Sequence, residues 1–485
     1  MPAAAAGERP LSAAVWKPAL IVSLALAAFW PTLRVGFMID DPYLLRAAQS
    51  PPGISAAAIK ADLTSNVHKE AGAFYYRPVL ALLTRAEYSL WGRSPAGYHA
   101  VSLLFHAGNA VLLYCLLSSL GLGQALSLLS ACLFAVNPLI IDDLLAATGG
   151  ESMANFLLLG SLLLFLKNRT AAALLLSVPA VFAKESNVTL PLLLAICLAF
   201  AGRLRSEYRK PLALLPVCGL YLWLRHLFVD APSAGAWQAL EFSLKSLPSA
   251  VFHYLGLLLV PLGLETWPRL PEPSPFWPLY LAAAAAAAAG IFLLPLKRRL
   301  AFFCLAWFLA GLAPKVPAML FNQVLMDKWI FMSAPAVFLL LLGLLELPGK
   351  IYTARLRLLP HAVVAAAAVF WIAVAHAEVK LRGSDEKNYR WTLRDGPRLF
   401  AGYRLGLILM GEGRYPEAVE ALAPLLKLAP DRPDPQNAFA MALWHSGRRA
   451  EALKMMTALG RTYPDNVPIK ENLARMRLLA AGKGG

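Results

Sequence analysis

The sequence is poor in charge and in cysteine, and both shortages narrow the class of protein. Only 15% of the 485 residues are charged and 58% are hydrophobic, whereas soluble domains carry about 25% charged residues. This composition argues against an ordinary soluble enzyme. The five cysteines all lie in apolar runs without metal-site spacing, so we interpret them as core residues with no disulfide or metal role.

The sequence also lacks the motifs that bind soluble nucleotides or zinc and those that activate a serine nucleophile. An activated donor would therefore have to reach the protein through the lipid bilayer. The formal net charge is +16, but the basic residues form short clusters between apolar runs, as in the cytoplasmic loops of membrane proteins. We therefore expect membrane lipids as partners, and no nucleic acid.

Long apolar runs dominate residues 1–378 and predict a polytopic, all-α membrane domain. The first run, from Trp16 to Phe37, is long enough to span the bilayer; a cleaved signal peptide is the alternative, although the prolines in this segment make a poor cleavage region. Further spans are expected at 99–119, 121–141, 153–166, 171–183, 187–202, 211–229, 276–296, 300–318, 330–347 and 360–378.

Clusters of Lys and Arg orient these spans. They lie at 167–169, 203–210, 297–299 and 350–357. All four face the cytoplasm if the N-terminus is inside and the run 248–264 does not cross. We therefore expect about eleven spans, an interfacial or re-entrant segment at 248–264, and a C-terminal tail outside. The long segment 38–98 mixes polar and aromatic residues, which favours an outer loop with interfacial helices.

The C-terminal residues 379–485 have a different composition, with 18 Lys/Arg and 11 Asp/Glu, and they contain an internal repeat. The recurring residues, 34 positions apart, are Gly413/Gly447, Glu417/Glu451, Ala418/Ala452, Pro430/Pro464 and Asp431/Asp465. This period is typical of tetratricopeptide repeats. We expect a linker at 379–397 and an α-solenoid of two repeats over 398–485, whose last helix caps the open apolar face.

Acidic residues that could carry chemistry gather on the predicted outer side. Asp40 and Asp41 follow the first span, and Asp142, Asp143 and Glu151 follow the third. The first pair is either a solvated helix end or a general base or metal ligand that faces a lipid-linked substrate. The second set is either a polar turn or a group that orients an acceptor hydroxyl, or that binds a divalent cation such as Mg²⁺ or Mn²⁺ together with the first pair.

Basic residues on the same side could bind a phosphate. Arg77 follows two tyrosines, and Lys184 precedes Glu185 between two spans. Such cations suit a phosphate leaving group, although Lys184 could equally be a snorkelling lysine with a local acid. His99 and His106 share one helix face, but their separation favours a packed polar stripe over a metal site.

The order of several motifs resembles the transmembrane and tetratricopeptide-repeat O-mannosyltransferase family and its bacterial relatives. These motifs are Tyr76-Arg77-Pro78-Val79, Trp91-Gly92, Gly97-Tyr98-His99, Phe134-Ala135-Val136-Asn137-Pro138, Lys184-Glu185 and Asp327-Lys328-Trp329-Ile330-Phe331. The resemblance covers nearly the whole chain. It implies a GT-C glycosyltransferase that moves a sugar from a polyprenyl-phosphate donor to a hydroxyl acceptor. In a bacterium, this would occur on the periplasmic side of the inner membrane, with the repeats recruiting the acceptor protein.

The resemblance also implies roles for individual residues. Asp41, or its neighbour Asp40, would be the general base. The residues expected to bind the lipid phosphate are Arg77, Lys184 and Lys328, and those expected to orient the acceptor or the donor are Asp142, Asp143, Glu151 and His99. The chain departs from the family at Asn137, Gly150 and Asp327-Lys328, where the family carries His, Arg and Glu-Arg, so its substrate could differ.

Other functions are compatible with the same sequence. The acceptor could be a lipid or a glycan instead of a protein. A non-catalytic membrane scaffold whose repeats bind partner proteins would have the same architecture. A transporter is less compatible, because no span carries paired intramembrane acids or a visible inverted repeat.

Overall fold

The computed structural model describes residues 11–69, 75–229, 236–268, 274–293, 298–322, 324–345 and 358–481. Its regular elements within these ranges are all helices, which confirms the predicted all-α class. The chain divides after Lys380 into two compact units, and each is described by itself.

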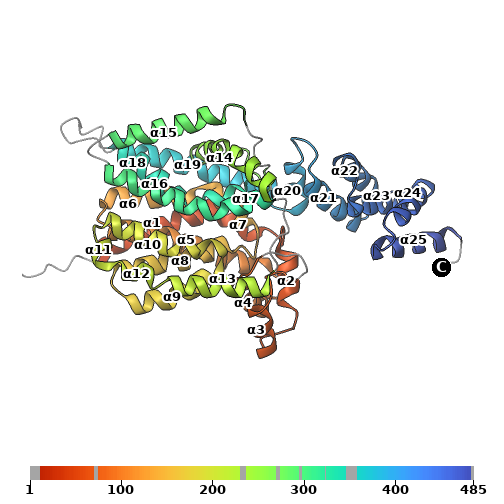
Figure 1. The fold of residues 1–485 in the computed structure, drawn as a ribbon, viewed down its shortest axis with the longest axis horizontal. Coiled ribbons are helices and arrows are strands. Elements are labelled where there is room, and N and C mark those ends of the chain that lie inside the picture. The colour runs from red at the N-terminus through yellow and green to blue at the C-terminus, as the bar shows by residue number, and fades with distance from the viewer. Residues whose placement is uncertain are drawn as a thin grey trace, which may run out of the picture. The chain divides into compact units, whose positions relative to one another are not determined.

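The first unit contains helices α1 to α19 (Figure 1). Their bounds are α1 Leu11–Phe29, α2 Asp41–Ala48, α3 Ala56–Leu63, α4 Pro78–Trp91, α5 Pro95–Ser119, α6 Gln124–Val136, α7 Ile141–Leu145, α8 Glu151–Leu166, α9 Thr170–Ala183, α10 Leu190–Phe200, α11 Leu204–Glu207, α12 Arg209–Leu212, α13 Leu215–Phe228, α14 Ala236–Leu259, α15 Trp277–Leu293, α16 Arg298–Leu312, α17 Val316–Asn322, α18 Ala334–Leu345 and α19 Leu359–Arg382. Short 3₁₀ helices lie between them, namely η1 Trp30–Arg34, η2 Pro138–Ile140, η3 Glu185–Thr189, η5 Ala313–Lys315 and η6 Asp327–Ile330.

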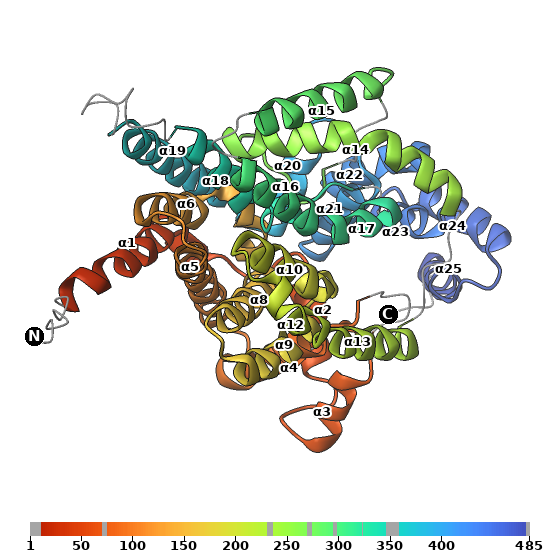
Figure 2. The same ribbon diagram turned by 60° about the vertical axis from the view of Figure 1, so that its left-hand side comes forward.

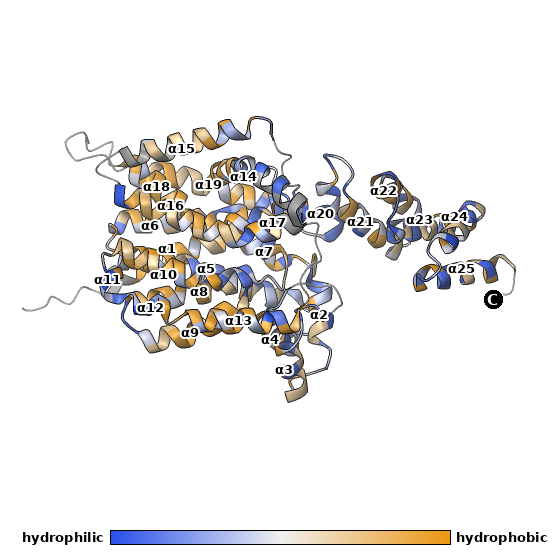
Figure 3. Cartoon of the chain, in the orientation of Figure 1, coloured by the Kyte–Doolittle hydropathy of each residue, from blue (hydrophilic) through white to orange (hydrophobic). Residues whose placement is uncertain are grey.

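Many of these helices are apolar enough for a bilayer. Five helices in the described part are long enough to cross it, or six if the bent pair Gln124–Val136 and Pro138–Leu145 forms one span. Shorter apolar helices lie at 151–166, 170–183, 185–200, 277–286 and 334–345. Large apolar side chains such as Leu175, Trp223 and Phe302 are exposed, and hydrophobic residues dominate the helices in Figure 3. The chain is a multi-pass membrane protein, and the number of about eleven spans stays a prediction.

The core of this unit forms around α5, which packs against α1, α6 and α8. Figures 1 and 2 both show α1, α5 and α6 side by side. A Cβ atom at Gly108 would lie 2.7 Å from the Phe156 ring of α8, so the absence of a side chain lets α5 and α8 approach closely. Residues 248–264 fall on the second half of α14 and the turn after it, and their interfacial or re-entrant position also stays a prediction.

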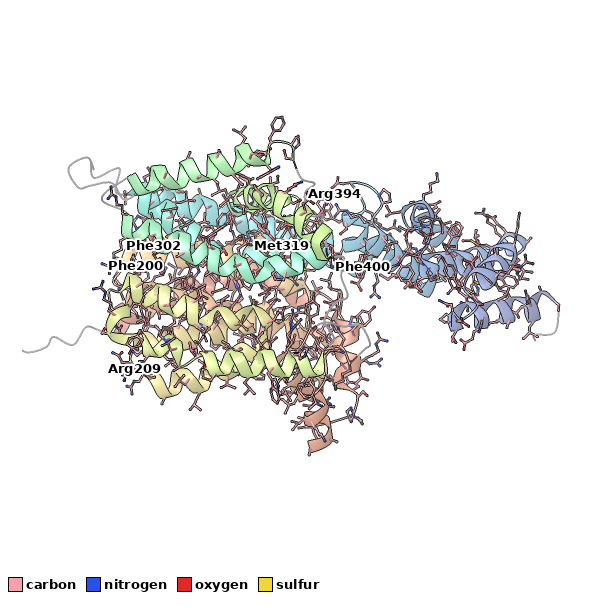
Figure 4. All side chains as sticks on the ribbon, viewed as in Figure 1. Phe200, Arg209, Phe302, Met319, Arg394 and Phe400 are labelled. Atoms are coloured by element: carbon pink, nitrogen blue, oxygen red, sulfur yellow. The ribbon has the colours of Figure 1, made fainter. Side chains whose placement is uncertain are left out.

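Two of the predicted basic clusters lie together at one end of the unit. Arg203 and Lys210 both donate hydrogen bonds to the Asn168 side chain, at 2.8 and 2.7 Å. In Figure 4, Arg209 lies at this end of the helices, and Met319 lies toward the other end. The clusters predicted at 297–299 and 350–357 fall partly or wholly outside the described residues, because Lys297 and residues 350–357 are not described.

The second unit is a stack of helices joined by short turns. Its elements are α20 Asp385–Thr392, α21 Leu399–Gly411, α22 Tyr415–Leu428, α23 Pro433–His445, α24 Arg449–Thr462 and α25 Val467–Ala480. Each helix from α20 to α25 contacts the next in the chain. Gly413 and Gly447 have φ values of +76° and +92°, which a glycine adopts without strain after a helix end. The segment expected as a linker contains α20, which packs on α21 with Tyr389 buried.

Candidate functional site

Asp41 is a buried anchor of the loop that follows the first helix. Its carboxylate is 0% exposed and accepts hydrogen bonds from the backbone N–H groups of Met38 at 2.8 Å, Ala147 at 3.0 Å and Thr148 at 2.8 Å. The Thr148 hydroxyl donates a fourth, at 2.6 Å. Burial raises the pKa of Asp41 to about 6, and these donors oppose the shift. The carboxylate therefore uses both oxygens to join the segment between η1 and α2 to the loop before α8.

Asp40, in contrast, is exposed at the N-cap position of α2 and lines a pocket of about 540 Å³. Five basic and two acidic side chains line this pocket. The lining residues are Asp40, Tyr75, Arg77, Lys184, Glu185, Val188, Tyr221, Leu222, Arg225, Pro314, Lys315, Pro317, Ala318, Met326, Lys328 and Trp329. The excess of positive charge makes the pocket suitable for an anion.

All three residues predicted to bind a phosphate line this one pocket. Arg77 precedes α4, Lys184 lies between α9 and η3, and Lys328 lies on η6. The fold thus brings three distant segments of the sequence to one pocket, which Asp40 also lines. This grouping is the main agreement between the predicted site and the geometry.

The position of Lys328 depends on its neighbour Asp327. Asp327 is buried, and its Oδ2 accepts a hydrogen bond from the Glu265 N–H at 2.8 Å. The preceding residue, Met326, accepts a hydrogen bond from the Tyr254 hydroxyl at 2.8 Å. These contacts fix the turn that presents Lys328 to the pocket.

The other predicted site residues are buried and do not line the pocket. Asp143 accepts hydrogen bonds from the N–H groups of Glu151 and Ser152, at 2.9 and 2.8 Å, and so caps the N-terminus of α8. Asp142 is also buried and lies 3.3 Å from the Thr266 hydroxyl. Both acids are used within the fold, so their geometry favours a structural role over direct contact with a substrate.

His99, on α5, is also buried. Its Nδ1 atom lies 2.9 Å from the carbonyl oxygen of Leu144, and its Nε2 atom lies 3.1 Å from that of Val35. Both ring nitrogens therefore contact backbone groups of other segments. The interpretation of His99 and His106 as a packed polar stripe fits this geometry, because both imidazoles are buried on α5.

The described residues offer no ready metal site. Within the described ranges, no group of three or more His, Cys, Asp or Glu side chains is placed to hold a metal ion. A ligand set for the divalent cation considered from the sequence is therefore not found within these ranges.

Sequence reasoning missed two basic residues of the pocket, Lys315 and Arg225. Both fall inside segments predicted as membrane spans, at 300–318 and 211–229. A cation within an apolar span is itself a sign of function, because it is costly there without a partner. That signal was available in the sequence.

The architecture and the pocket define a class: a multi-pass helical membrane protein with a pocket lined by an excess of basic residues and with a helical-repeat unit. Residues 409–475 match the family model described as "Tetratricopeptide repeat", which confirms the predicted repeats. The predicted fold class, an all-α membrane domain followed by these repeats, is therefore confirmed.

Curated relatives of this chain include proteins from a mammal and an insect. The chain is 26% identical over 220 residues to "Protein O-mannosyl-transferase TMTC3" of Mus musculus, which covers 42% of this chain and 23% of the mouse protein. It is 26% identical over 200 residues to "Protein O-mannosyl-transferase Tmtc1" of Drosophila melanogaster. This match covers 38% of this chain and 23% of the Drosophila protein. The chain thus matches about a quarter of the length of these curated relatives. The similarity confirms the predicted resemblance to this family.

A solved structure was also matched. The Archaeoglobus fulgidus oligosaccharyltransferase, tethered to an acceptor peptide, aligns with 79% of this chain and 57% of its own, at a TM-score of 0.44 and 14% identity.

Proposed function

We propose that this chain is a membrane glycosyltransferase of the GT-C type that moves mannose or another hexose from a polyprenyl-phosphate donor to a hydroxyl acceptor. The observation that carries the proposal is the pocket that unites Asp40 with Arg77, Lys184 and Lys328. It combines a candidate base with candidate phosphate ligands, which are the two elements that such a transfer needs. The names of the similar proteins, protein O-mannosyl-transferases, support the reaction class.

In the proposed reaction, Asp40 accepts the proton of the acceptor hydroxyl. The hydroxyl oxygen bonds to the anomeric carbon of the sugar while the bond from that carbon to the phosphate oxygen breaks. The polyprenyl phosphate leaves with the bonding electron pair, and the configuration at the carbon is inverted. We transfer the role of base from Asp41 to Asp40, because a base must reach the substrate, and Asp41 is buried with both oxygens engaged.

The basic side chains stabilise the leaving phosphate, on which negative charge develops. Fixed cations in a site partly shielded from water contribute strongly to such stabilisation. Lys184 and Lys328 are the main phosphate ligands from the predicted set. The Arg77 guanidinium is already paired with Glu185. Only its remaining N–H donors can therefore bind the phosphate.

Apolar side chains in the same pocket suit a lipid-linked donor. Leu222, Pro317 and Ala318 line it beside the cations. Leu222 lies on α13, whose neighbouring Trp223 is 57% exposed, as expected for a helix that faces lipid. A phosphate joined to a polyprenyl chain matches this combination of charged and apolar walls.

The side of the membrane follows from the basic clusters. The pocket residues Lys315, Pro317 and Ala318 directly precede Met319, which lies away from the end that carries Arg209 (Figure 4). Because clustered Lys and Arg mark the cytoplasmic side, the pocket faces outward. In a bacterium, we propose, the chain lies in the inner membrane with its pocket and repeat unit in the periplasm, where the repeats bind the acceptor protein.

The test is transfer by the purified full-length protein from polyprenyl-phosphate mannose to Ser/Thr peptides, glycans and lipids, with Asp40→Asn as the paired variant. Transfer that is lost in the variant supports the proposal. Transfer to a glycan or lipid alone would replace the protein acceptor. Absence of both transfer and donor binding in the wild type would instead favour the membrane scaffold.

A further inference from the structure

One buried carboxylate holds two lysines at the wall of the pocket. Oε1 of Glu151, the first residue of α8, forms an ion pair with the Lys184 ammonium group, and the same oxygen lies 3.1 Å from Nζ of Lys315. The three residues are 4%, 6% and 5% exposed. They come from separate segments, since Lys184 precedes η3 and Lys315 ends η5. The carboxylate therefore brings two distant ammonium groups together.

This cluster carries more positive than negative charge. One carboxylate faces two ammonium groups, and both lysines line the pocket whereas Glu151 is not among its lining residues. Buried charges are normally paired, because an uncompensated charge is costly in a poorly hydrated site. The surplus positive charge at the pocket wall thus points to an anionic ligand. An ion-pair cluster with only a structural role would be expected to balance its charges, so that no surplus positive charge faces the cavity.

We propose that Lys315 is a further phosphate-binding residue of the pocket and that Glu151 is the positioning residue that holds Lys315 beside Lys184, so that both ammonium groups bind one phosphate. This inference rests on the proposed function and deepens it. It changes the role predicted for Glu151, which was to orient an acceptor or donor, and gives a role to Lys315, which had none.

The electrostatics of Lys184 show what Glu151 contributes. Burial lowers the pKa of Lys184 to about 7, the carboxylate of Glu151 opposes the shift, and the cations of Lys315 and Arg77 reinforce it. Glu185, on η3, acts in the same direction as Glu151. Without Glu151, the Lys184 ammonium would lose its largest compensating charge, and the pKa of Lys184 would fall further below its ordinary value.

Lys328, on η6, is another cation of the pocket, and its charge acts on Glu151. Lys328 is unchanged in the variants of Lys315 and Glu151, so its contribution to anion binding is the same in all of them.

The first experiment measures binding of farnesyl phosphate to the purified full-length protein. Farnesol, which has the same isoprenoid chain but no phosphate, is the uncharged control ligand. Lys315→Met should weaken farnesyl phosphate binding roughly ten- to a hundredfold, as expected for a lost charged hydrogen bond, and should leave farnesol binding unchanged. Lys315→Arg should restore much of the loss. Lys60→Met, which removes an exposed lysine of α3, is the matched control and should bind as the wild type does.

The second experiment tests Glu151 as a positioning residue through the pH dependence of farnesyl phosphate binding, because lost packing alone would not shift it. In the wild type, the affinity should fall as the pH rises through about 7, where Lys184 loses its proton. In Glu151→Gln, this fall should move to lower pH, because the carboxylate that opposes the loss of the proton is gone. Melting temperatures in detergent identify any variant that does not fold. If Lys315→Met does not fold, the affinity of Lys315→Arg for farnesyl phosphate tests the role of Lys315 instead.

The outcomes separate this inference from the proposed function. The role of Lys315 is overturned if the wild type transfers sugar and Lys315→Met binds farnesyl phosphate with unchanged affinity. If the affinity of Glu151→Gln falls over the same pH range as that of the wild type, the role of Glu151 is overturned. Phosphate-specific binding that needs Lys315, in a wild type that transfers no sugar to any acceptor, would support the phosphate site and reject the glycosyltransferase.

Discussion

Arg77 and Glu185 lie 108 positions apart in the sequence and form a two-point ion pair, in which Nε donates to Oε2 at 2.8 Å and Nη2 donates to Oε1 at 2.5 Å. The guanidinium also lies over the Tyr75 ring, 4.3 Å from its centre. The pair joins the segment before α4 to η3. Because it commits two of the guanidinium donors, Arg77 shapes the wall of the pocket as well as adding charge to it.

Glu185→Gln should therefore destabilise the first unit. The change leaves a half-buried guanidinium with a weaker, neutral partner, which typically costs about 1–3 kcal/mol. Thermal unfolding of the purified protein in detergent measures the effect. Glu241→Gln breaks an exposed pair with Lys245 and serves as the control, since exposed pairs contribute little. Equal melting temperatures for the two variants would contradict the anchoring role.

Asp40 and Asp41 should separate activity from stability. Asp40→Asn should lower sugar transfer about 10²–10⁴-fold, the usual contribution of a general base, with an unchanged melting temperature. Asp41→Asn should destabilise the protein by about 1–3 kcal/mol, because an amide cannot accept all four hydrogen bonds. Transfer assays and thermal unfolding on the same preparations test both. A stable, inactive Asp41 variant beside an active Asp40 variant would return the role of base to Asp41.

Asp41 should also make stability depend on pH. Burial raises its pKa from the ordinary 3.8 to about 6, so the folded protein holds this proton more tightly than the unfolded chain does. The stability that it contributes is fully present below pH 3.8 and is lost as the pH rises through about 6. The melting temperature should fall over this window, and the fall should be smaller in Asp41→Asn. Parallel curves for the two proteins would show that Asp41 titrates normally.

Much of the fold could be predicted, because its signals are local. Apolar runs predict helices for a bilayer, and a period of 34 residues predicts helical hairpins. The motif order also selected Arg77, Lys184 and Lys328, which the structure places around one pocket. These residues are adjacent to turns, where polar side chains at the edge of a membrane are least costly.

The remaining features depend on tertiary contacts that sequence patterns do not show. Adjacent aspartates look equivalent in sequence, yet Asp41 points into the protein because the N–H groups of Ala147 and Thr148 meet it there. Lys315 was hidden because it lies within a predicted apolar span, and its partner Glu151 is 164 positions away. Which side chain faces the pocket is decided by such distant pairings.

The boundary between the two units determines where the repeat unit can be removed. Helix α20 belongs to this unit, because Arg390 pairs with Glu417 at 2.8 Å and Arg414 pairs with Glu386 at 2.9 Å. A truncation after Lys380 therefore removes the whole second unit. A truncation after residue 397 leaves α20 without its partner helices, and the exposed face of Tyr389 should make that protein less soluble.

If the repeats recruit the acceptor protein, the protein truncated after Lys380 should still bind farnesyl phosphate and should still transfer sugar to short peptides. Transfer to folded acceptor proteins should fall, because the reaction loses the local concentration that the second binding site supplies. Competition between a peptide and a folded acceptor in one reaction measures this ratio directly. An unchanged ratio would remove the recruitment role, while loss of farnesyl phosphate binding would show that the second unit is needed for the membrane unit to fold.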